Sequence, residues 1–197
     1  ADMLIMPVHT GGGNGFWQWL QRMEQLALQG ATLGSGLAGT PVLASGANMA
    51  VRRTAFTKVG GYHADRWASG DDVVLLKRMR SAGMRVGTLA DPEVAVLVAP
   101  EPDVRGFVSQ RLRWAGKMRA QWDAAGLFAM LATIGLPLLL VVGTWYMTSN
   151  PGPSFLRNWT LLLAAWTCWV VPIVGLVRTT ARFFQRMPHQ AWDRLPW

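Results

Sequence analysis

Two adjacent carboxylates stand at the start of a predicted helix. Asp71 and Asp72 are followed by VVLLKRMRSAG, in which apolar residues fall on one face and Gly83 provides a C-terminal stop. A carboxylate at a helix N-terminus is explained by capping and by the positive end of the helix dipole, but two adjacent ones repel each other. Two interpretations therefore remain open. Either both aspartates serve the helix end, or one caps it while the other faces a cleft as a general base, kept ionised by the dipole.

The sequence QRLRW offers a second chemistry. On a helix, Gln110, Arg113 and Trp114 lie on one stripe. An amide, a guanidinium and an indole provide a hydrogen bond, bidentate anion recognition and a stacking surface, which together suit a diphosphate beside a sugar. The opposite stripe is apolar and consists of Val104, Phe107, Val108, Leu112 and Ala115. Because a helix with a basic and an apolar side suits a membrane surface, we expect Arg111 and Arg119 to reach lipid headgroups.

Charge and hydropathy divide the chain near Asp123. Residues 1–123 contain 14 basic and 10 acidic groups, whereas residues 124–197 contain five and one. No charged residue occurs between Ala124 and Leu156, and the stretch from Asn158 to Val177 is also uncharged. Each stretch is long enough to cross a bilayer, whereas two helices of a soluble bundle would normally show polar residues every second turn. Basic residues flank the pair of stretches, so the positive-inside rule predicts that both chain ends are cytoplasmic.

Composition excludes several classes of protein. The chain is 51% hydrophobic and 15% charged, which excludes a disordered protein. Its one cysteine, Cys168, excludes an intrachain disulfide and a cysteine zinc site, and no two of its three histidines stand at metal-ligand spacing. The net charge of +8 is explained by the cytoplasmic flanks, so nucleic acid is not an expected partner. Eleven tryptophans instead favour a membrane interface or a sugar-binding cleft.

The elements that would position the two polar groups are those of a mixed α/β domain. The candidate strands are MLIMPV, VLASGANMAVRR, MRVGTLA and EVAVLVA. Between the first two strands, Phe16 to Gln29 has helical spacing and Gly30 is a plausible stop, so residues 31–41 are expected to form a loop. The sequence thus predicts short strands alternating with helices, ahead of an apolar C-terminal part.

Four features, taken in their order and spacing, resemble the C-terminal portion of a membrane-integrated family 2 glycosyltransferase. This group includes cellulose, chitin and hyaluronan synthases and ceramide glucosyltransferase. SGANMAVRR at 45–53 with VGGY at 59–62 resembles the acceptor-side segment, and SGDD resembles the family's ED or GDD motif. QRLRW resembles its Gln-x-x-Arg-Trp motif, and membrane helices follow at once.

The resemblance implies a GT-A-like domain and an inverting sugar transfer. Asp72 would be the general base that deprotonates an acceptor hydroxyl, and Asp71 would support it or cap the helix. Arg113 and Gln110 would hold the leaving nucleoside diphosphate. The remaining substrate-binding residues would be Trp114, against the sugars, and Asn48, on the acceptor side. The implied partners are a nucleotide-sugar donor, a saccharide or lipid acceptor and membrane lipids.

The predicted organisation has six parts. They are the C-terminal part of a GT-A-like catalytic domain at 1–102, an amphipathic interface helix at 103–122, a transmembrane helix at 124–147, an external loop at 148–158, a second transmembrane helix at 159–178 and a basic cytoplasmic tail at 179–197. The expected location is the inner or plasma membrane, with two spans and the catalytic part in the cytoplasm.

The sequence departs from the family pattern in one respect. The chain contains no Asp-x-Asp motif, with which the family holds Mg²⁺ or Mn²⁺, and Asp2 is a lone carboxylate. We therefore expect the metal ligands to lie mostly outside this chain, and expect a fragment without transferase activity of its own. The alternative function is a non-catalytic basic membrane protein that binds anionic lipid through its amphipathic helix.

Overall fold

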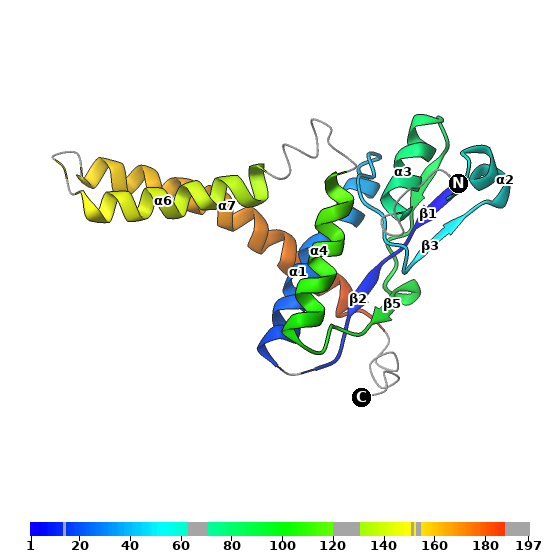
Figure 1. Cartoon of the computed structure of the whole chain (residues 1–197), viewed down its shortest axis with the longest axis horizontal. Coiled ribbons are helices and arrows are strands. Elements are labelled where there is room, and N and C mark those ends of the chain that lie inside the picture. The colour runs from blue at the N-terminus through cyan, green and yellow to red at the C-terminus, as the bar shows by residue number, and fades with distance from the viewer. Residues whose placement is uncertain (14, 63–70, 120–130, 151, 153–154, 188–197) are drawn as a thin grey trace. The chain divides into compact units, whose positions relative to one another are not determined.

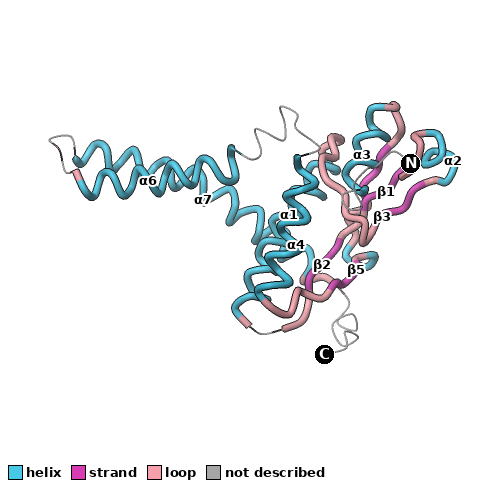
Figure 2. Tube along the Cα trace, viewed as in Figure 1, coloured by secondary structure: helices cyan, strands magenta, loops and turns pink. Residues whose placement is uncertain are grey.

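The computed structural model describes residues 1–13, 15–62, 71–119, 131–150, 152 and 155–187. The chain divides into two compact units, one formed by Ala1–Lys117 with Leu176–Trp197 and the other by Met118–Gly175. The first unit contains short strands and helices, and the described part of the second is helical (Figures 1 and 2). The mixed α/β class predicted from the sequence is confirmed.

Two small sheets organise the first unit. In one, β1 (Met3–Ile5) lies between β3 (Met49–Val51), to which it is antiparallel, and β4 (Val86–Thr88), to which it is parallel. In the other, β2 (Val8–Thr10) pairs in parallel with β5 (Val96–Val98). All four candidate strand segments therefore contribute to a sheet, although VLASGANMAVRR does so only near its end.

A hydrophobic core joins β1 to helix α3 (Asp71–Ser81). Its buried members are Met3, Ile5, Ala55, Leu75, Leu76 and Met79. Ala55 comes from the short helix α2 (Arg53–Lys58). The apolar face predicted for α3 is confirmed, and so is its stop: Gly83 has a φ of 66°, and the Met84 amide donates to the Met79 carbonyl at 2.9 Å.

Asp2 fastens the sheet at the start of β1. One carboxylate oxygen accepts the Arg85 amide at 3.0 Å, and the other lies 3.5 Å from Nε of Arg52. The hydrogen bond from Arg85, followed by the charges of Arg85 and Arg52, lowers the pKa of Asp2. This lone carboxylate therefore holds the segments that follow β3 and precede β4, and it is committed to two arginines.

Helix α1 (Phe16–Leu37) extends past the predicted stop at Gly30. A Cβ atom at Gly30 would lie 2.5 Å from Oγ1 of Thr180 and 2.7 Å from Cδ1 of Leu176, both on helix α7 (Phe155–Phe184). The glycine thus permits close packing of two helices and does not end α1. The expectation of a loop beginning at residue 31 is wrong, because tertiary packing here outweighs the low helix propensity of glycine.

A second core forms around the C-terminal end of α7. Its buried members are Leu26, Phe184 and Met187, with Leu97 packed beside them. The His9 ring lies against the Phe184 ring with centroids 4.5 Å apart. Burial, and secondarily the positive charge of Arg22, lowers the pKa of His9 to about 4. This histidine lies in β2 and is 7% exposed, so its ring belongs to the second core.

Helix α4 (Val104–Arg119) confirms the helix predicted around QRLRW. It follows β5 and begins after Asp103, whose carboxylate accepts the Gly106 amide at 2.7 Å. Of its predicted apolar stripe, Val104, Val108 and Leu112 are exposed. The short helix η1 (Pro92–Val94) lies between β4 and β5.

The described part of the second unit is apolar and helical. The π-helical turn η2 (Leu131–Gly135) leads into α6 (Leu136–Ser149), and Nε1 of Trp166 on α7 donates to Oγ1 of Thr144 on α6 at 3.1 Å. Among the described helices, α7 is long and apolar enough over Leu156–Phe184 to cross a membrane, and α6 is apolar but shorter. The predicted span at 159–178 lies within α7, whereas part of the span predicted at 124–147 lies outside the described residues.

The packing at Gly30 predicts opposite effects for two similar substitutions on α1. Gly30→Ala should lower stability by about 1–3 kcal/mol, because its methyl group would force Thr180 and Leu176 aside. The matched control, Gly34→Ala, has no atom within 4 Å of the added carbon and should stabilise by about 0.5–1 kcal/mol through helix propensity. Thermal unfolding of the purified protein measures both. Equal shifts for the two variants would contradict the packing role of Gly30.

The buried imidazole predicts a pH-dependent stability. His9 has a folded pKa of about 4 against an ordinary value of 6.5, so the unfolded chain binds its proton first as the pH falls. Stability should be full above pH 6.5 and should decline towards pH 4, by up to about 3 kcal/mol in total. Unfolding midpoints between pH 7.5 and 4.5 measure this decline. His9→Phe keeps a ring against Phe184 and should flatten the profile; an unchanged profile would show that another group is responsible.

Candidate active site

The structure brings Asp72 into contact with a turn 26 residues earlier in the chain. One Asp72 carboxylate oxygen accepts the Gly46 amide at 2.9 Å, and the other accepts the Val73 amide at 2.9 Å. Gly46 lies in a tight turn that is closed by a hydrogen bond from the Asn48 amide to the Ser45 carbonyl at 3.1 Å. Because Asp72 is partly buried and each oxygen meets an N–H group, its carboxylate has a defined orientation. The SGAN and SGDD segments thus meet at one place.

Asn48 anchors the turn that carries Gly46. Its side-chain Nδ2 atom donates to the Pro7 carbonyl at 2.7 Å and to the Val94 carbonyl at 2.9 Å. Its backbone carbonyl accepts the Met6 amide at 3.1 Å. The residue is 9% exposed. Both amide hydrogens are therefore engaged within the protein, which leaves the side-chain oxygen for any contact with an acceptor. The predicted place of Asn48 on the acceptor side stays a prediction.

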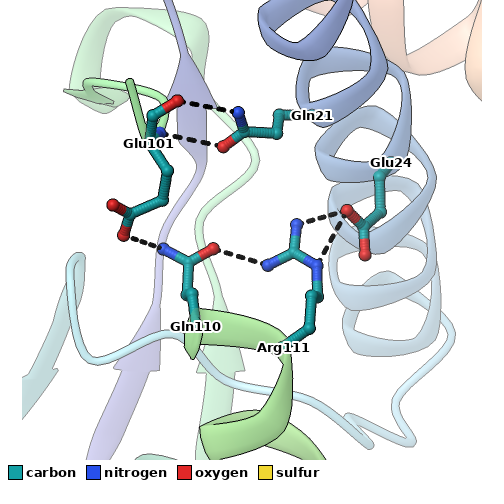
Figure 3. Close-up of polar contacts among 5 residues, drawn as sticks. All are labelled: Gln21, Glu24, Glu101, Gln110 and Arg111. Atoms are coloured by element: carbon teal, nitrogen blue, oxygen red, sulfur yellow. Dashed lines mark hydrogen bonds and ion pairs between the residues drawn. The ribbon is translucent and has the colours of Figure 1, made fainter. Parts of the chain in front are cut away.

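Gln110 and Arg111 belong to a polar network between α4 and α1 (Figure 3). Nε2 of Gln110 donates to the Glu101 carboxylate at 2.9 Å, and the Gln110 oxygen accepts from Arg111. The Arg111 guanidinium also donates to the Glu24 carboxylate, with Nε at 3.0 Å. Gln21, one turn before Glu24 on α1, exchanges two hydrogen bonds with the Glu101 backbone at 2.9 and 3.0 Å. The contacts join five residues in series from Gln21 to Glu24, and the α1 backbone between these two residues completes a ring.

The structure assigns different environments to the two arginines of QRLRW. The prediction that Arg111 reaches lipid headgroups is wrong: its side chain is 23% exposed, pairs with Glu24 and lies over the Phe107 ring at 4.5 Å from the centroid. The Glu24 carboxylate on α1 and the Phe107 ring one turn earlier on α4 hold this cation against the protein. Arg113, two residues further, is exposed. The side chains of Trp114 and Asp71 lie outside the described part of the structure.

The candidate residues thus form two groups. Asp72 meets the turn of Gly46 and Asn48, and Gln110 meets Arg111 and Glu101, with no residue common to the two sets of contacts. Sequence reasoning missed Glu24 and Gln21. A usable sign was present, because Gln18, Gln21 and Glu24 recur at three-residue spacing on a helix that is otherwise largely apolar. That spacing predicts a polar stripe but does not identify its partner.

Divalent metal ions do not fit the carboxylates that the structure describes. Across the described residues, no three His, Cys, Asp or Glu side chains gather closely enough to hold a metal ion. Asp2 is engaged by Arg52 and Arg85, and Asp72 by backbone amides. We accordingly derive no chemical step through a metal. The expectation that the Mg²⁺ or Mn²⁺ ligands lie mostly outside this chain stays a prediction.

Comparison with known families bears directly on these residues. A family model described as glycosyl transferase family 21 matches residues 4–193. No curated protein and no solved structure matches the chain. The match covers both candidate groups and confirms a glycosyltransferase family member. The resemblance to family 2 synthases and the GT-A assignment stay predictions.

The anchoring contacts of Asn48 predict an unusual order of stabilities. Asn48→Ala should cost about 1–3 kcal/mol, because two partly buried carbonyls lose their donor. Asn48→Asp should cost more than Asn48→Ala, since a carboxylate would face both carbonyl oxygens. Thermal or urea unfolding measures the order. In the exposed control, Asn150→Asp, one hydrogen bond to the Tyr146 carbonyl at 3.1 Å is lost, and little change is expected. If Asn48→Asp is as stable as that control, the anchoring role is wrong.

Proposed function

The chain belongs to glycosyl transferase family 21, and we propose that it supplies the acceptor-activating part of an inverting transferase working at a membrane. The reaction moves a sugar from a nucleotide-sugar donor to a hydroxyl group of a saccharide or lipid acceptor. The acceptor oxygen forms a bond to the anomeric carbon while the bond from that carbon to the diphosphate breaks. The acceptor proton passes to Asp72, and the bonding electron pair leaves with the nucleoside diphosphate.

The observation that carries this proposal is the contact between Asp72 and the Gly46 turn. A general base must be held within hydrogen-bond reach of the hydroxyl that it deprotonates. Asp72 stands at the N-terminus of α3, where the helix dipole favours its anionic form. Its two oxygens are oriented by the Gly46 and Val73 amides, each at 2.9 Å. The turn lies in the segment that resembles the acceptor side of family 2 enzymes, so base and acceptor would meet there.

Arg113 is our candidate for holding the leaving diphosphate. Charge develops on the leaving group in the transition state, and a cation on a rigid element stabilises it at small reorganisation cost. Arg113 is exposed on α4, a helix fixed to α1 by the network around Arg111. Gln110 is less available, because Glu101 and Arg111 both engage its amide. Trp114 follows Arg113 and would contact the sugars.

Two features support action at a membrane. Helix α7 has the length and composition of a membrane span over Leu156–Phe184, and only 6% of its most apolar stretch is buried within the protein. The first unit also exposes aromatic and aliphatic side chains on α1 and α4, namely Phe16, Trp17, Trp19, Val104, Val108 and Leu112. Aromatic residues of this kind favour the interface between lipid and water. We propose two spans, with the catalytic part and both chain ends in the cytoplasm.

A metal ion is the part of the proposed reaction for which we assign no ligand in this chain. Its sequence contains no Asp-x-Asp, and the described carboxylates do not fit a divalent ion. We propose that Mg²⁺ or Mn²⁺, if the reaction uses one, is held by residues beyond these 197, and that this chain alone does not transfer sugar. The base and the diphosphate-binding arginine would be its contribution.

Asp72→Asn tests the proposed function directly. Membranes that contain the longer enzyme are incubated with a panel of UDP- and GDP-sugars, and the products are analysed for sugar identity and chain length. Asp72→Asn should lower transfer by about 10²–10⁴-fold, because an amide cannot accept the proton. Membrane attachment of the variant should be unchanged.

The control for this experiment is Asp91→Asn. Asp91 accepts the Glu93 amide at 3.0 Å and caps η1, and asparagine serves equally well as a cap. If Asp72→Asn transfers sugar as fast as the wild type, Asp72 is excluded as the general base. Absence of transfer in the wild type with every donor, together with binding to anionic vesicles, would instead favour the lipid-binding alternative.

A further inference from the structure

Glu24 lies in the first unit on α1, outside every motif that points to sugar transfer. Its carboxylate accepts two hydrogen bonds from Arg111, including the one from Nε at 3.0 Å. The side chains of Glu24 and Arg111 are 35% and 23% exposed, so the pair is partly shielded from water. Such a pair resists screening better than one on an open surface.

The pair is one end of the series of contacts drawn in Figure 3, which the α1 backbone between Glu24 and Gln21 completes as a ring. From Glu24 the ring passes through Arg111 to Gln110, from Gln110 to the Glu101 carboxylate, and from the Glu101 backbone to Gln21. Glu24 and Gln21 are one turn apart on the same helix. Gln110 and Arg111 each contact two partners, Gln110 with Glu101 and Arg111, and Arg111 with Gln110 and Glu24. These contacts fix the rotation of α4 relative to α1.

The ring also separates the two arginines of QRLRW. Three guanidinium nitrogens of Arg111 donate within it, Nε and one terminal nitrogen to Glu24 and the other terminal nitrogen to Gln110. Binding a diphosphate with Arg111 would therefore require breaking the contact with Glu24. Arg113 is exposed, and its direction is set by the rotation of α4.

We propose that Glu24 is a positioning residue for sugar transfer, acting through Arg111 and Gln110 to aim Arg113 at the leaving diphosphate. This inference rests on the proposed function. Removing the carboxylate frees Arg111 from α1 and leaves a partly buried guanidinium without its anionic partner. The rotation of α4 then relaxes, and Arg113 loses its alignment while the protein keeps its fold. Glu24 thus affects the transition state only through the position of Arg113 and does not itself contact the substrate.

The test is a double-mutant cycle between Glu24→Gln and Arg113→Ala in the longer enzyme, with kcat, KM for the donor, and inhibition by nucleoside diphosphate measured. Glu24→Gln alone should lower kcat by about 10–100-fold, as expected when a catalytic group is misplaced by about 1 Å. Arg113→Ala should cost about 10²-fold in the wild-type background. In the Glu24→Gln background it should cost less than about tenfold, because a misaligned arginine contributes little.

Two variants control for general damage. Glu93→Gln makes the same chemical change at an exposed carboxylate on η1, and kcat should not change. Glu24→Asp keeps the charge on a shorter side chain and should retain more activity than Glu24→Gln. If Glu24→Gln does not fold, the double variant Glu24→Gln/Arg111→Gln removes both charges and takes its place in the cycle.

The outcomes separate this inference from the proposed function. Non-additive losses, with a weaker inhibition by nucleoside diphosphate in Glu24→Gln, support positioning. Strictly additive losses, or equal kcat in Glu24→Gln and Glu93→Gln, overturn the positioning role while Asp72-dependent transfer upholds the proposed function. A wild-type enzyme without transfer overturns both.

Discussion

The first unit depends on helix α1 running unbroken past Gly30. The helix contacts different parts of the unit along its length. Near its start it binds the α4 network through Gln21 and Glu24. Further along, the Gln29 side chain accepts the buried Val8 amide at 3.0 Å, and Gly30 meets α7. A helix that stopped at residue 30 would leave Thr88 of β4, which lies against Gly36, without this neighbour. The continuous helix α1 therefore sets the positions of β4, of the second core around α7 and of α4, which carries QRLRW.

The parts of this fold that were predictable from sequence are those with a local cause. The spacing of apolar residues predicts the buried face of α3, and Gly83 predicts the left-handed turn that ends it. The apolar run MLIMPV likewise predicts its own burial. Gly30 has two possible causes, a helix end or a close helix contact, and only the position of α7 decides between them. The first half of VLASGANMAVRR was predicted as strand, but it carries a turn that Asn48 fixes through Pro7 and Val94, both more than 40 residues away.

The candidate site shows the same division. The carboxylate pair left two interpretations open, and the resemblance carried by the order of the motifs named Asp72. The contact with Gly46 then added the direction in which its carboxylate is held. Spacing placed Arg113 correctly on a helix surface, but it assigned Arg111 to lipid headgroups. The structure corrects that assignment through Glu24, which is 87 residues from Arg111 in the chain. A single sequence records the charge of each residue, whereas the pairing of charges is a property of the folded chain. The length and apolar composition of α7 were predictable from the sequence and needed no tertiary information.

The second core, around Phe184, can form only late in the synthesis of the chain. Phe184 and Met187 pack with Leu26, and the Phe184 ring covers His9, so the first unit uses residues from both ends of the described chain. The apolar segment of the second unit is synthesised between them. During translation the strands and α1 emerge long before Phe184, and contacts at such separation form late because closing a long loop costs entropy. The globular part is therefore completed only after the apolar segment has left the ribosome. Phe184 and Met187 are the last buried residues of this core to be made, so exposure of the apolar segment and closure of the core are successive steps of one folding process.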